Sequence, residues 1–490
     1  MNFNINISFY LQRLIPILAS ILILLFTACQ EKELDISPVT SISDKEAYST
    51  PEKIEGQVNG LYTQLSSSVF YGGRVIVFNE QRGNEFSQND GNNSTGANVW
   101  NQSISASGNF VNAVWNAAYT TINSANILIE NLENSRVVDE ALRRSYIGEA
   151  KFIRAFCYFT LVQTYAKPFN QDPNSPALPL RLKAEVSGGN NDLEFSTVSE
   201  IYTQIINDLD ESEMALPVAY SNAVLNTSRA RKATAIALKT RVYLTQSSFS
   251  KVIEEANKLV SASAPYLYTE GSITHRLESN IATVFSGSYV GNEAIFTIPF
   301  FIASEAPGQQ AALAYNYLSP VLYLNSEGIV SDPVFASPTS NDARKQLILT
   351  NANGQKLLNK FKKNNAPFFD YIPLIRYAEV LLNYAEAAAK SNNLEKAFDL
   401  LETVRHRSDP SFTFSTGLSN EADLVQAILN ERRIELLGEG FRTFDLFREV
   451  SPLPAKQGNA GTSPQILPTA ENYVWPIPSG ELAYNQLAPR

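Results

Sequence analysis

Apolar residues recur every three to four positions along most of this chain, in stretches that come in pairs joined by short polar turns. The clearest pair covers residues 374–390 and 394–407, with Ser391, Asn392 and Asn393 between them. This period predicts amphipathic helices. Helix hairpins that cannot bury their apolar faces alone must stack on one another, as in tetratricopeptide-like folds. The spacers between pairs are unequal, so we do not expect a regular array.

Further helices are predicted on the same grounds over residues 114–132, 139–165, 198–214, 230–244 and 249–260. In residues 139–165 the apolar positions crowd more than one face, which predicts a helix with neighbours on two sides. Cys157 lies in this pattern and is interpreted as a core residue. We expect a mostly helical, all-α protein whose strands are confined to short hairpins.

Two regions interrupt the helices, residues 66–112 and 261–370, and both are rich in Gly, Asn, Ser and aromatic residues. Long irregular stretches in a compact protein are usually functional loops or disorder. Aromatic residues placed between polar ones favour functional loops, and we expect the strands to lie in these two regions.

The amino-terminal segment predicts export. Residues 14–26 are almost wholly apolar but too short for a bilayer core of about 30 Å, and Phe26, Thr27, Ala28 and Cys29 follow. The pattern resembles the lipobox of bacterial lipoproteins, so residues 1–28 are predicted to be a signal peptide and Cys29 the acylated mature terminus. The alternative is an ordinary secretory signal with an accidental cysteine. Residues 29–50 are polar and are expected to form a lipidated, flexible tether.

The charge balance bears on the ligand. Residues 1–29 contain one base and no acid, so the remaining chain carries 38 bases against 49 acids, a net charge of −11. An acidic chain without a basic cluster repels phosphate backbones, and nucleic acid is therefore an unexpected ligand. With Cys29 acylated, Cys157 has no partner for a disulfide.

Five blocks in order along the chain carry a family resemblance. They are GEAKFIRAFCYFTL from Gly148, RKATAIALKTRVYL from Arg231, YIPLIRYAEVLLNYAEAAA from Tyr371, ILNERRIELLGEGFRTFDLFR from Ile428 and VWPIPSGELAYNQL from Val474. Asp342 and Arg344 fall where an Asp-x-Arg motif is common. Together these blocks resemble the SusD/RagB family of outer-membrane lipoproteins.

The resemblance implies four tetratricopeptide-like helix pairs forming a scaffold at 51–65, 113–260 and 371–450, within a domain spanning 51–490. It implies a loop-rich ligand-binding region over 66–112 and 261–370. It also implies a surface-exposed, lipid-anchored place in the outer membrane and a SusC-like TonB-dependent transporter as partner. The ligand would be an oligosaccharide, or a peptide as in some members, and no cofactor is implied.

An enzyme must be weighed against this binding role. Glu80 and Glu85 could form an acid pair for glycoside hydrolysis, but a polar loop whose acids pair with Arg74 or Arg82 explains them better. The acids and bases of residues 431–448 recur at three- and four-residue steps and are interpreted as ion pairs and helix caps. His275 and His406 stand alone, so a zinc site is not expected, and residues 90–93 are interpreted as a turn without a metal.

A glycan binder places flat rings beside amides in its loops, because sugar faces stack on rings while hydroxyls pair with amides. The expected ligand-binding residues are therefore Trp100, Asn101, Tyr71, Arg82, Tyr289 and Tyr315. Trp100 occupies the region that supplies a sugar-stacking ring in similar proteins, and its alternative is a loop anchor packed on the scaffold. A protein-interaction scaffold that uses only a groove on the helices remains a third possibility.

Overall fold

The computed structural model describes residues 44–189, 191–414, 418 and 420–489. The chain divides into two units, Met1–Ile54 and Glu55–Arg490. The described part of the first unit contains α2 (Asp44–Ala47) and the start of α3 (Pro51–Leu65). The predicted signal peptide, Cys29 and most of the predicted tether lie outside the described residues.

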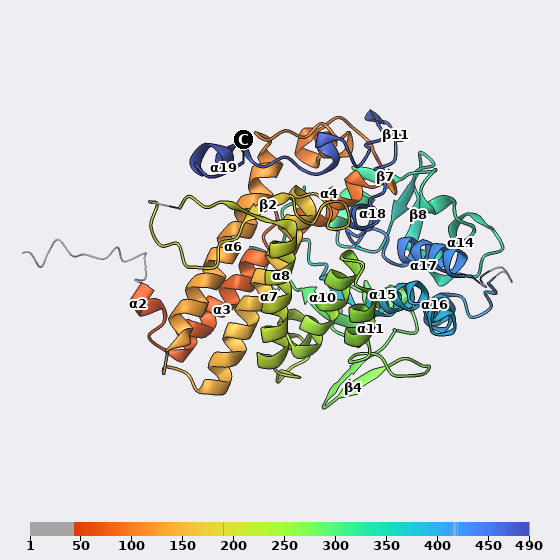
Figure 1. Cartoon of the computed structure of the whole chain (residues 1–490). Helices are drawn as coiled ribbons and strands as arrows, with labels where there is room; N and C mark the ends of the chain where they lie inside the picture. Colours follow the sequence, from red (N-terminus) through yellow and green to blue (C-terminus); the bar gives the residue numbers. More distant parts are fainter. Residues whose placement is uncertain (1–43, 190, 415–417, 419, 490) are drawn as a thin grey trace, which may run out of the picture. The chain divides into compact units, whose positions relative to one another are not determined.

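Eight helices of the second unit pack as a succession of neighbours (Figure 1). They are α6 (Asn109–Glu133), α7 (Glu140–Tyr165), α8 (Val198–Ala215), α10 (Lys232–Thr245), α11 (Phe249–Ala256), α15 (Tyr377–Lys390), α16 (Leu394–Ser408) and α17 (Glu421–Glu435). Each contacts the next in this order. The predicted helical scaffold of stacked pairs is confirmed.

Local sequence sets where these helices begin. The Asp139 side chain accepts a hydrogen bond from the Leu142 N–H at 2.9 Å and so caps α7. Thr197 and Glu200 form a capping box at the start of α8. Helix α7 is buried on most of its surface, and Cys157 is fully buried there, as predicted.

Paired charges hold neighbouring helices together. Arg154 of α7 makes a two-pronged contact with Asp208 of α8, with N–O distances of 2.7 and 2.8 Å. Arg241 of α10 contacts Glu379 of α15 in the same way. Such fork-to-carboxylate pairs fix geometry as well as charge, so they set how adjacent helices lie.

The predicted helix start at residue 374 is wrong. The helix expected from residue 374 starts at Tyr377, because Ile372–Arg376 forms strand β10. This strand pairs antiparallel with β6 (Ala294–Ile298), and both are buried along their length. A short apolar run that is buried on both faces has no period to distinguish strand from helix.

The remaining strands are short. They are β1 (Phe86–Gln88), β2 (Pro176–Pro179), β3 (Phe195–Thr197), β4 (Tyr268–Glu270), β5 (Ile273–His275), β7 (Leu322–Leu324), β8 (Ile348–Thr350), β9 (Lys356–Leu358), β11 (Lys456–Gly458) and β12 (Gly461–Ser463). Strands β2, β3, β10, β11 and β12 lie outside the two loop-rich regions, and β1 pairs with the distant β7. The expectation that strands are confined to hairpins in those regions is therefore wrong.

Short helices connect these parts. They are α4 (Arg74–Arg82), η2 (Asn93–Thr95), α5 (Ala97–Trp100), α9 (Leu225–Ser228), α12 (Ile281–Val284), α13 (Leu313–Leu318), η3 (Ile329–Ser331), α14 (Pro333–Ala336), η4 (Ala343–Leu347), α18 (Arg442–Arg448), η5 (Glu471–Tyr473) and α19 (Ser479–Tyr484). Between α17 and α18 the chain turns through Gly438 and Gly440, which have φ of 78° and 85°. Glycine adopts both conformations without steric strain, which lets the chain turn here. Within the described ranges, no helix is both long and apolar enough to span a bilayer.

Candidate functional site

A hollow of about 700 Å³ opens where the tips of three two-stranded ladders meet. Its walls come from β1 and β7, from the segment after β7 with η3 and α14, from the turn between β8 and β9, and from the turn between β11 and β12. The lining residues are Ser87, Tyr323, Leu324, Asn325, Ser326, Glu327, Val330, Ser331, Ala336, Asn353, Gly354, Gln355, Lys356, Gln457, Gly458 and Asn459. A volume of this size lies within the usual range for small-molecule sites, roughly 300–1,000 Å³.

Backbone pairing brings these distant segments together. In the β1–β7 ladder Ser87 lies opposite Tyr323. The Ser87 hydroxyl donates to the Gln457 carbonyl oxygen at 2.5 Å, and the Ala460 N–H donates to the Gln88 carbonyl oxygen at 3.0 Å. The hairpin of β11 and β12 is therefore fastened to the strand whose other edge carries β7.

Tyr323 and Asn459 hold each other at the rim. The Asn459 N–H donates to the Tyr323 phenol oxygen at 3.1 Å, and the phenol donates to the Asn459 side-chain oxygen at 3.3 Å. The Asn459 amide nitrogen in turn donates to the Asn89 side-chain oxygen at 2.8 Å. The half-buried Tyr323 ring is thus restrained at its hydroxyl while it lines the hollow.

The turn between β8 and β9 is organised by Asn351. Its side-chain oxygen accepts hydrogen bonds from the N–H groups of Asn353 and Gln355, both at 3.0 Å. Gly354 has a φ of 77°, a conformation that glycine adopts without strain. This turn fixes the backbone that presents the Asn353 and Gln355 amides at the hollow.

The charge of the lining is small. Among its residues Glu327 is the one acidic and Lys356 the one basic side chain, and the other polar groups are amides and hydroxyls. Such a surface offers hydrogen bonds in many directions without a strong field of one sign, which suits a ligand rich in hydroxyls.

Glu85 holds the backbone beside the hollow in place. One of its carboxylate oxygens accepts a hydrogen bond from the Ile329 N–H at 2.6 Å, and the other contacts Arg433 at 2.8 Å and Arg442 at 3.2 Å. The sequence predicted Arg74 or Arg82 as partners of the acids in this segment, and that prediction is wrong for Glu85. Its partners come from α17 and α18, far along the chain.

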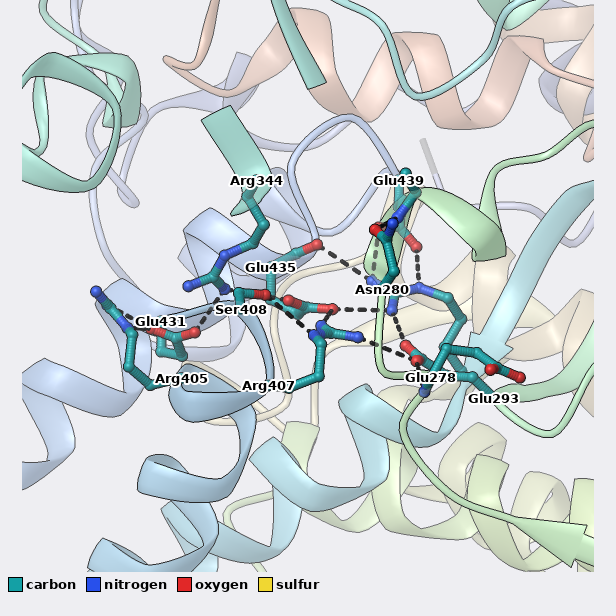
Figure 2. A network of polar contacts seen from close by, with 12 residues as sticks. Glu278, Asn280, Glu293, Arg344, Arg405, Arg407, Ser408, Glu431, Glu435 and Glu439 are labelled. Carbon is teal, nitrogen blue, oxygen red and sulfur yellow. Dashed lines mark hydrogen bonds and ion pairs between the residues drawn. The ribbon is translucent and has the colours of Figure 1, made fainter. Parts of the chain in front are cut away.

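A buried network of charges joins the second loop-rich region to the helical scaffold (Figure 2). Arg376 of β10 contacts Glu293 at 2.5 Å, Glu435 at 2.9 Å and Glu439 at 2.7 Å. Arg344 contacts both Glu431 and Glu435 of α17, at 2.6 and 3.1 Å. The structural interpretation of the acids and bases in 431–448 is confirmed, although most of their partners lie on other elements rather than on one helix.

The network is close to neutral. Its bases are Arg344, Lys360, Arg376, Arg405 and Arg407, and its acids are Glu293, Asp342, Glu431, Glu435 and Glu439. Burial alone would raise the pKa of Glu435, but Arg407, Arg376 and Arg344 outweigh it and hold that pKa well below the usual range. Balanced charges with several hydrogen bonds each make burial tolerable.

Trp100 does not line the hollow. Its side chain is 0 % exposed, and its Nε1 donates to the Phe86 carbonyl oxygen at 3.0 Å. The Lys456 ammonium lies 5.5 Å from the ring centre. The expectation that Trp100 stacks on ligand is therefore wrong, because both ring faces are covered by protein; it is the loop anchor of the alternative.

The other predicted residues are not brought together at the hollow. Arg82 is buried and donates to Gln102 and to two backbone carbonyls, and the buried Tyr71 hydroxyl contacts Thr160. Tyr289 donates to Glu278 at 2.6 Å. Asn101 is exposed, and its side-chain oxygen accepts hydrogen bonds from Ser103. Tyr315 is half-buried in α13.

The lining residues that sequence reasoning missed had a weak signal. Tyr323, Asn353 and Gln355 belong to the region 261–370 that was predicted to bind ligand, but nothing singled them out within it. Asn459 lies in a Gly- and Asn-containing segment near the carboxy end, which was assigned no role. Tyr323 and Asn459 are 136 residues apart, so spacing could not reveal their contact.

Among the described residues, no cluster of three or more His, Cys, Asp or Glu side chains could hold a metal ion. His275 is buried and lies 3.2 Å from the Arg231 guanidinium. Burial, with help from Arg231, lowers its pKa to about 3, so it is a neutral core residue.

Two protein-family profiles match this sequence. The profile of a family described as "Starch-binding associating with outer membrane" matches residues 32–244, and that of the SusD family matches residues 355–487. The SusD-like protein P2 of Formosa agariphila is 27% identical over 519 residues, covering 95% of this chain and 96% of its own.

Solved structures share the fold of this chain. A SusD superfamily protein from Bacteroides fragilis is 30% identical, with a TM-score of 0.80 over 90% of this chain and 100% of its own. A structure titled "Laminarin binding SusD-like protein" has a TM-score of 0.69 at 21% identity, over 90% of this chain and 99% of its own, and shows the shared fold. The helical scaffold with its short two-stranded sheets is the fold of the SusD superfamily. This chain belongs to the SusD/RagB family.

Proposed function

We propose that this protein is a lipoprotein of the outer membrane that binds an oligosaccharide at the cell surface and passes it to a SusC-like TonB-dependent transporter. The observation that carries the binding role is the hollow, in which amides and hydroxyls surround the restrained ring of Tyr323. The apolar face of a sugar packs on such a ring, while its hydroxyls exchange hydrogen bonds with the amides.

The relatives support this choice of ligand. One similar structure is titled for binding laminarin, and one matching family is described as starch-binding and associated with the outer membrane. The lining of the hollow adds a reason of its own. A peptide ligand would also find the amides, but it would gain little from a single ring beside so few apolar side chains.

Binding without catalysis fits the described lining. Glycoside hydrolysis normally needs two carboxyl groups that face one bond, about 5 to 10 Å apart. Of the residues that line the hollow, Glu327 is the one carboxylate. We therefore propose a carrier that holds its ligand unchanged.

Calorimetry against an oligosaccharide panel tests the binding role. Tyr323→Ala should lower the affinity for the best glycan by about 1 to 3 kcal/mol, the range for losing a central aromatic contact. Tyr315→Ala is the matched control, since Tyr315 is a half-buried tyrosine of the same region that does not line the hollow. Equal losses in both variants, or no glycan binding at all, would remove the hollow from the proposal.

Fractionation tests the anchor, and purification tests the partner. Cys29→Ser should release the mature protein from the membrane fraction, because the acyl chains then have no site of attachment. Pull-down from detergent-solubilised outer membranes should recover a TonB-dependent barrel protein with the wild-type chain. Retention of the Cys29→Ser variant, or recovery of no barrel, would contradict the corresponding part of the proposal.

A further inference from the structure

The two charged residues of the hollow differ from other charges in the protein. Lys356 and Glu327 have no ion-pair partner among the described residues. Neither side chain makes a hydrogen bond to another described residue. By contrast, the buried bases near this region, such as Arg344 and Lys360, each contact carboxylates. An unpaired charge at the wall of a ligand-sized hollow is available to a ligand.

Lys356 is held more firmly than Glu327. It is the first residue of β9, opposite Thr350 in the ladder, and its side chain is half-buried. Glu327 is exposed in the turn that follows Asn325. Charge interactions are stronger where water is partly excluded, and solvent and salt screen them at an exposed site. Lys356 is therefore the more effective of the two charges.

Neutral donors line the same hollow as this lysine. They are the side-chain amides of Asn353 and Gln457, and neither amide makes a hydrogen bond to another described residue. An ammonium group that shares a hollow with amide N–H donors suits an oxyanion, because charge-assisted hydrogen bonds are stronger than neutral ones. The net charge of −11 repels anions elsewhere, so this position would supply the local attraction.

We propose that Lys356 is a specificity-determining residue that makes the hollow prefer oligosaccharides bearing an anionic group, either a carboxylate or a sulfate ester. This inference rests on the proposed function of the hollow as a glycan site. It adds the class of glycan and the residue that selects it.

A glycan array with matched pairs tests the preference. Each acidic oligosaccharide is printed beside its neutral counterpart, methyl-esterified where the acid is a uronate and desulfated where it is a sulfate ester. We expect the acidic member of the best-bound pair to bind more tightly than the neutral member. This difference in affinity should shrink as the salt concentration is raised. The two kinds of pair also distinguish carboxylate from sulfate.

Charge variants then identify the residue. Lys356→Gln should weaken binding of the best acidic glycan about tenfold or more, the loss expected for a charge-assisted hydrogen bond, and leave its neutral counterpart unchanged. Lys183→Gln is the matched control, since Lys183 is an exposed lysine with no ion pair among the described residues and does not line the hollow, and it should leave the binding of both glycans unchanged. Glu327→Gln removes the opposite charge from the hollow and should strengthen binding of the acidic glycan. Thermal melting of all three variants should match the wild type, because none of these side chains contacts a charged partner in the part of the chain that the structure describes.

The outcomes separate the two proposals. If neutral members bind as well as acidic ones and Lys356→Gln changes nothing, while Tyr323→Ala abolishes binding, the anion preference is wrong and the glycan role stands. Loss of binding on Glu327→Gln instead would indicate a cationic ligand and also overturn the preference. If no glycan on the array binds, the proposed function itself fails.

Discussion

The indole Nε1 of Trp100 donates a hydrogen bond to the carbonyl oxygen of Phe86, 3.0 Å away in strand β1. The tryptophan is fully buried, so this bond ties helix α5 to the strand that carries one wall of the hollow. Trp100→Ala should therefore destabilise the protein by about 3–5 kcal/mol, as expected for a buried aromatic residue replaced by alanine. Chemical denaturation measures this.

Asn101→Ala is the control for Trp100, because the neighbouring Asn101 is exposed and bonded only locally. It should change the free energy of unfolding by less than about 0.5 kcal/mol. If Trp100→Ala keeps its stability but loses glycan affinity, Trp100 contacts the ligand and the anchor interpretation is wrong.

The shared bonds of Tyr323 and Asn459 predict a graded effect on ligand affinity. Tyr323→Phe keeps the ring but removes the hydroxyl that accepts from the Asn459 N–H and donates to its side chain. Affinity should fall by at most about 0.5–1.5 kcal/mol, because losing these bonds within the protein affects the ligand only through a less ordered ring. This loss is smaller than the loss expected for Tyr323→Ala. Calorimetry of both variants checks the order, and equal losses would mean that the ring itself contributes nothing.

Glu80 predicts a pH dependence of stability. Its carboxyl is buried and accepts one hydrogen bond, from the Gly440 N–H at 2.7 Å. Burial raises its pKa to about 8, more than the Gly440 contact lowers it. The native state therefore holds a proton that the unfolded chain releases above its ordinary pKa of 4.5. Between these values the contribution of Glu80 to stability falls as pH rises, by up to about 1.4 kcal/mol per pH unit.

Glu80→Gln tests the sign. Glutamine resembles the protonated acid and does not titrate, so the variant should gain stability relative to wild type as pH is raised from 5 towards 8. Denaturation curves at several pH values measure the difference. A difference that stays constant across this range would contradict a protonated Glu80.

Glu435 lies at the centre of the buried network, in contact with Arg344, Arg376 and Arg407. Glu435→Gln leaves these guanidinium groups short of one negative charge in a buried place, which should cost about 3–5 kcal/mol. Glu254→Gln removes a carboxylate from an exposed pair with Lys251 and should cost less than about 1 kcal/mol. Similar costs for both would show that the network is hydrated and its charges screened.

The helices could be predicted from the sequence because their signals are local. Each signal lies next to or within the helix that it predicts. Asp139 caps α7, Thr197 caps α8, and the apolar stripe of α7 lies within that helix. Strand β10 could not be distinguished from the start of α15, since its burial depends on pairing with β6, which ends 74 residues before β10 begins. The region 261–370, which the sequence predicts to bind ligand, supplies much of the lining of the hollow that we propose as the binding site.

The individual residues that line the hollow could not be predicted from the sequence for a different reason. An aromatic residue in a polar loop can point outward or anchor the loop, and Trp100 and Tyr323 look alike by that criterion. What separates them is the tertiary contact each makes, with Phe86 in one case and Asn459 in the other. The partners of Glu85, likewise, come from helices more than 300 residues away.

The rim of the hollow includes two turns that themselves contain the groups holding them in place, Asn351 in one and Asn459 in the other. After gene duplication, one copy could therefore acquire a new ligand by mutations in residues 351–355 and 457–461 only where these two asparagines are kept. The same constraint applies to a protein engineer who replaces the two turns to change ligand selectivity.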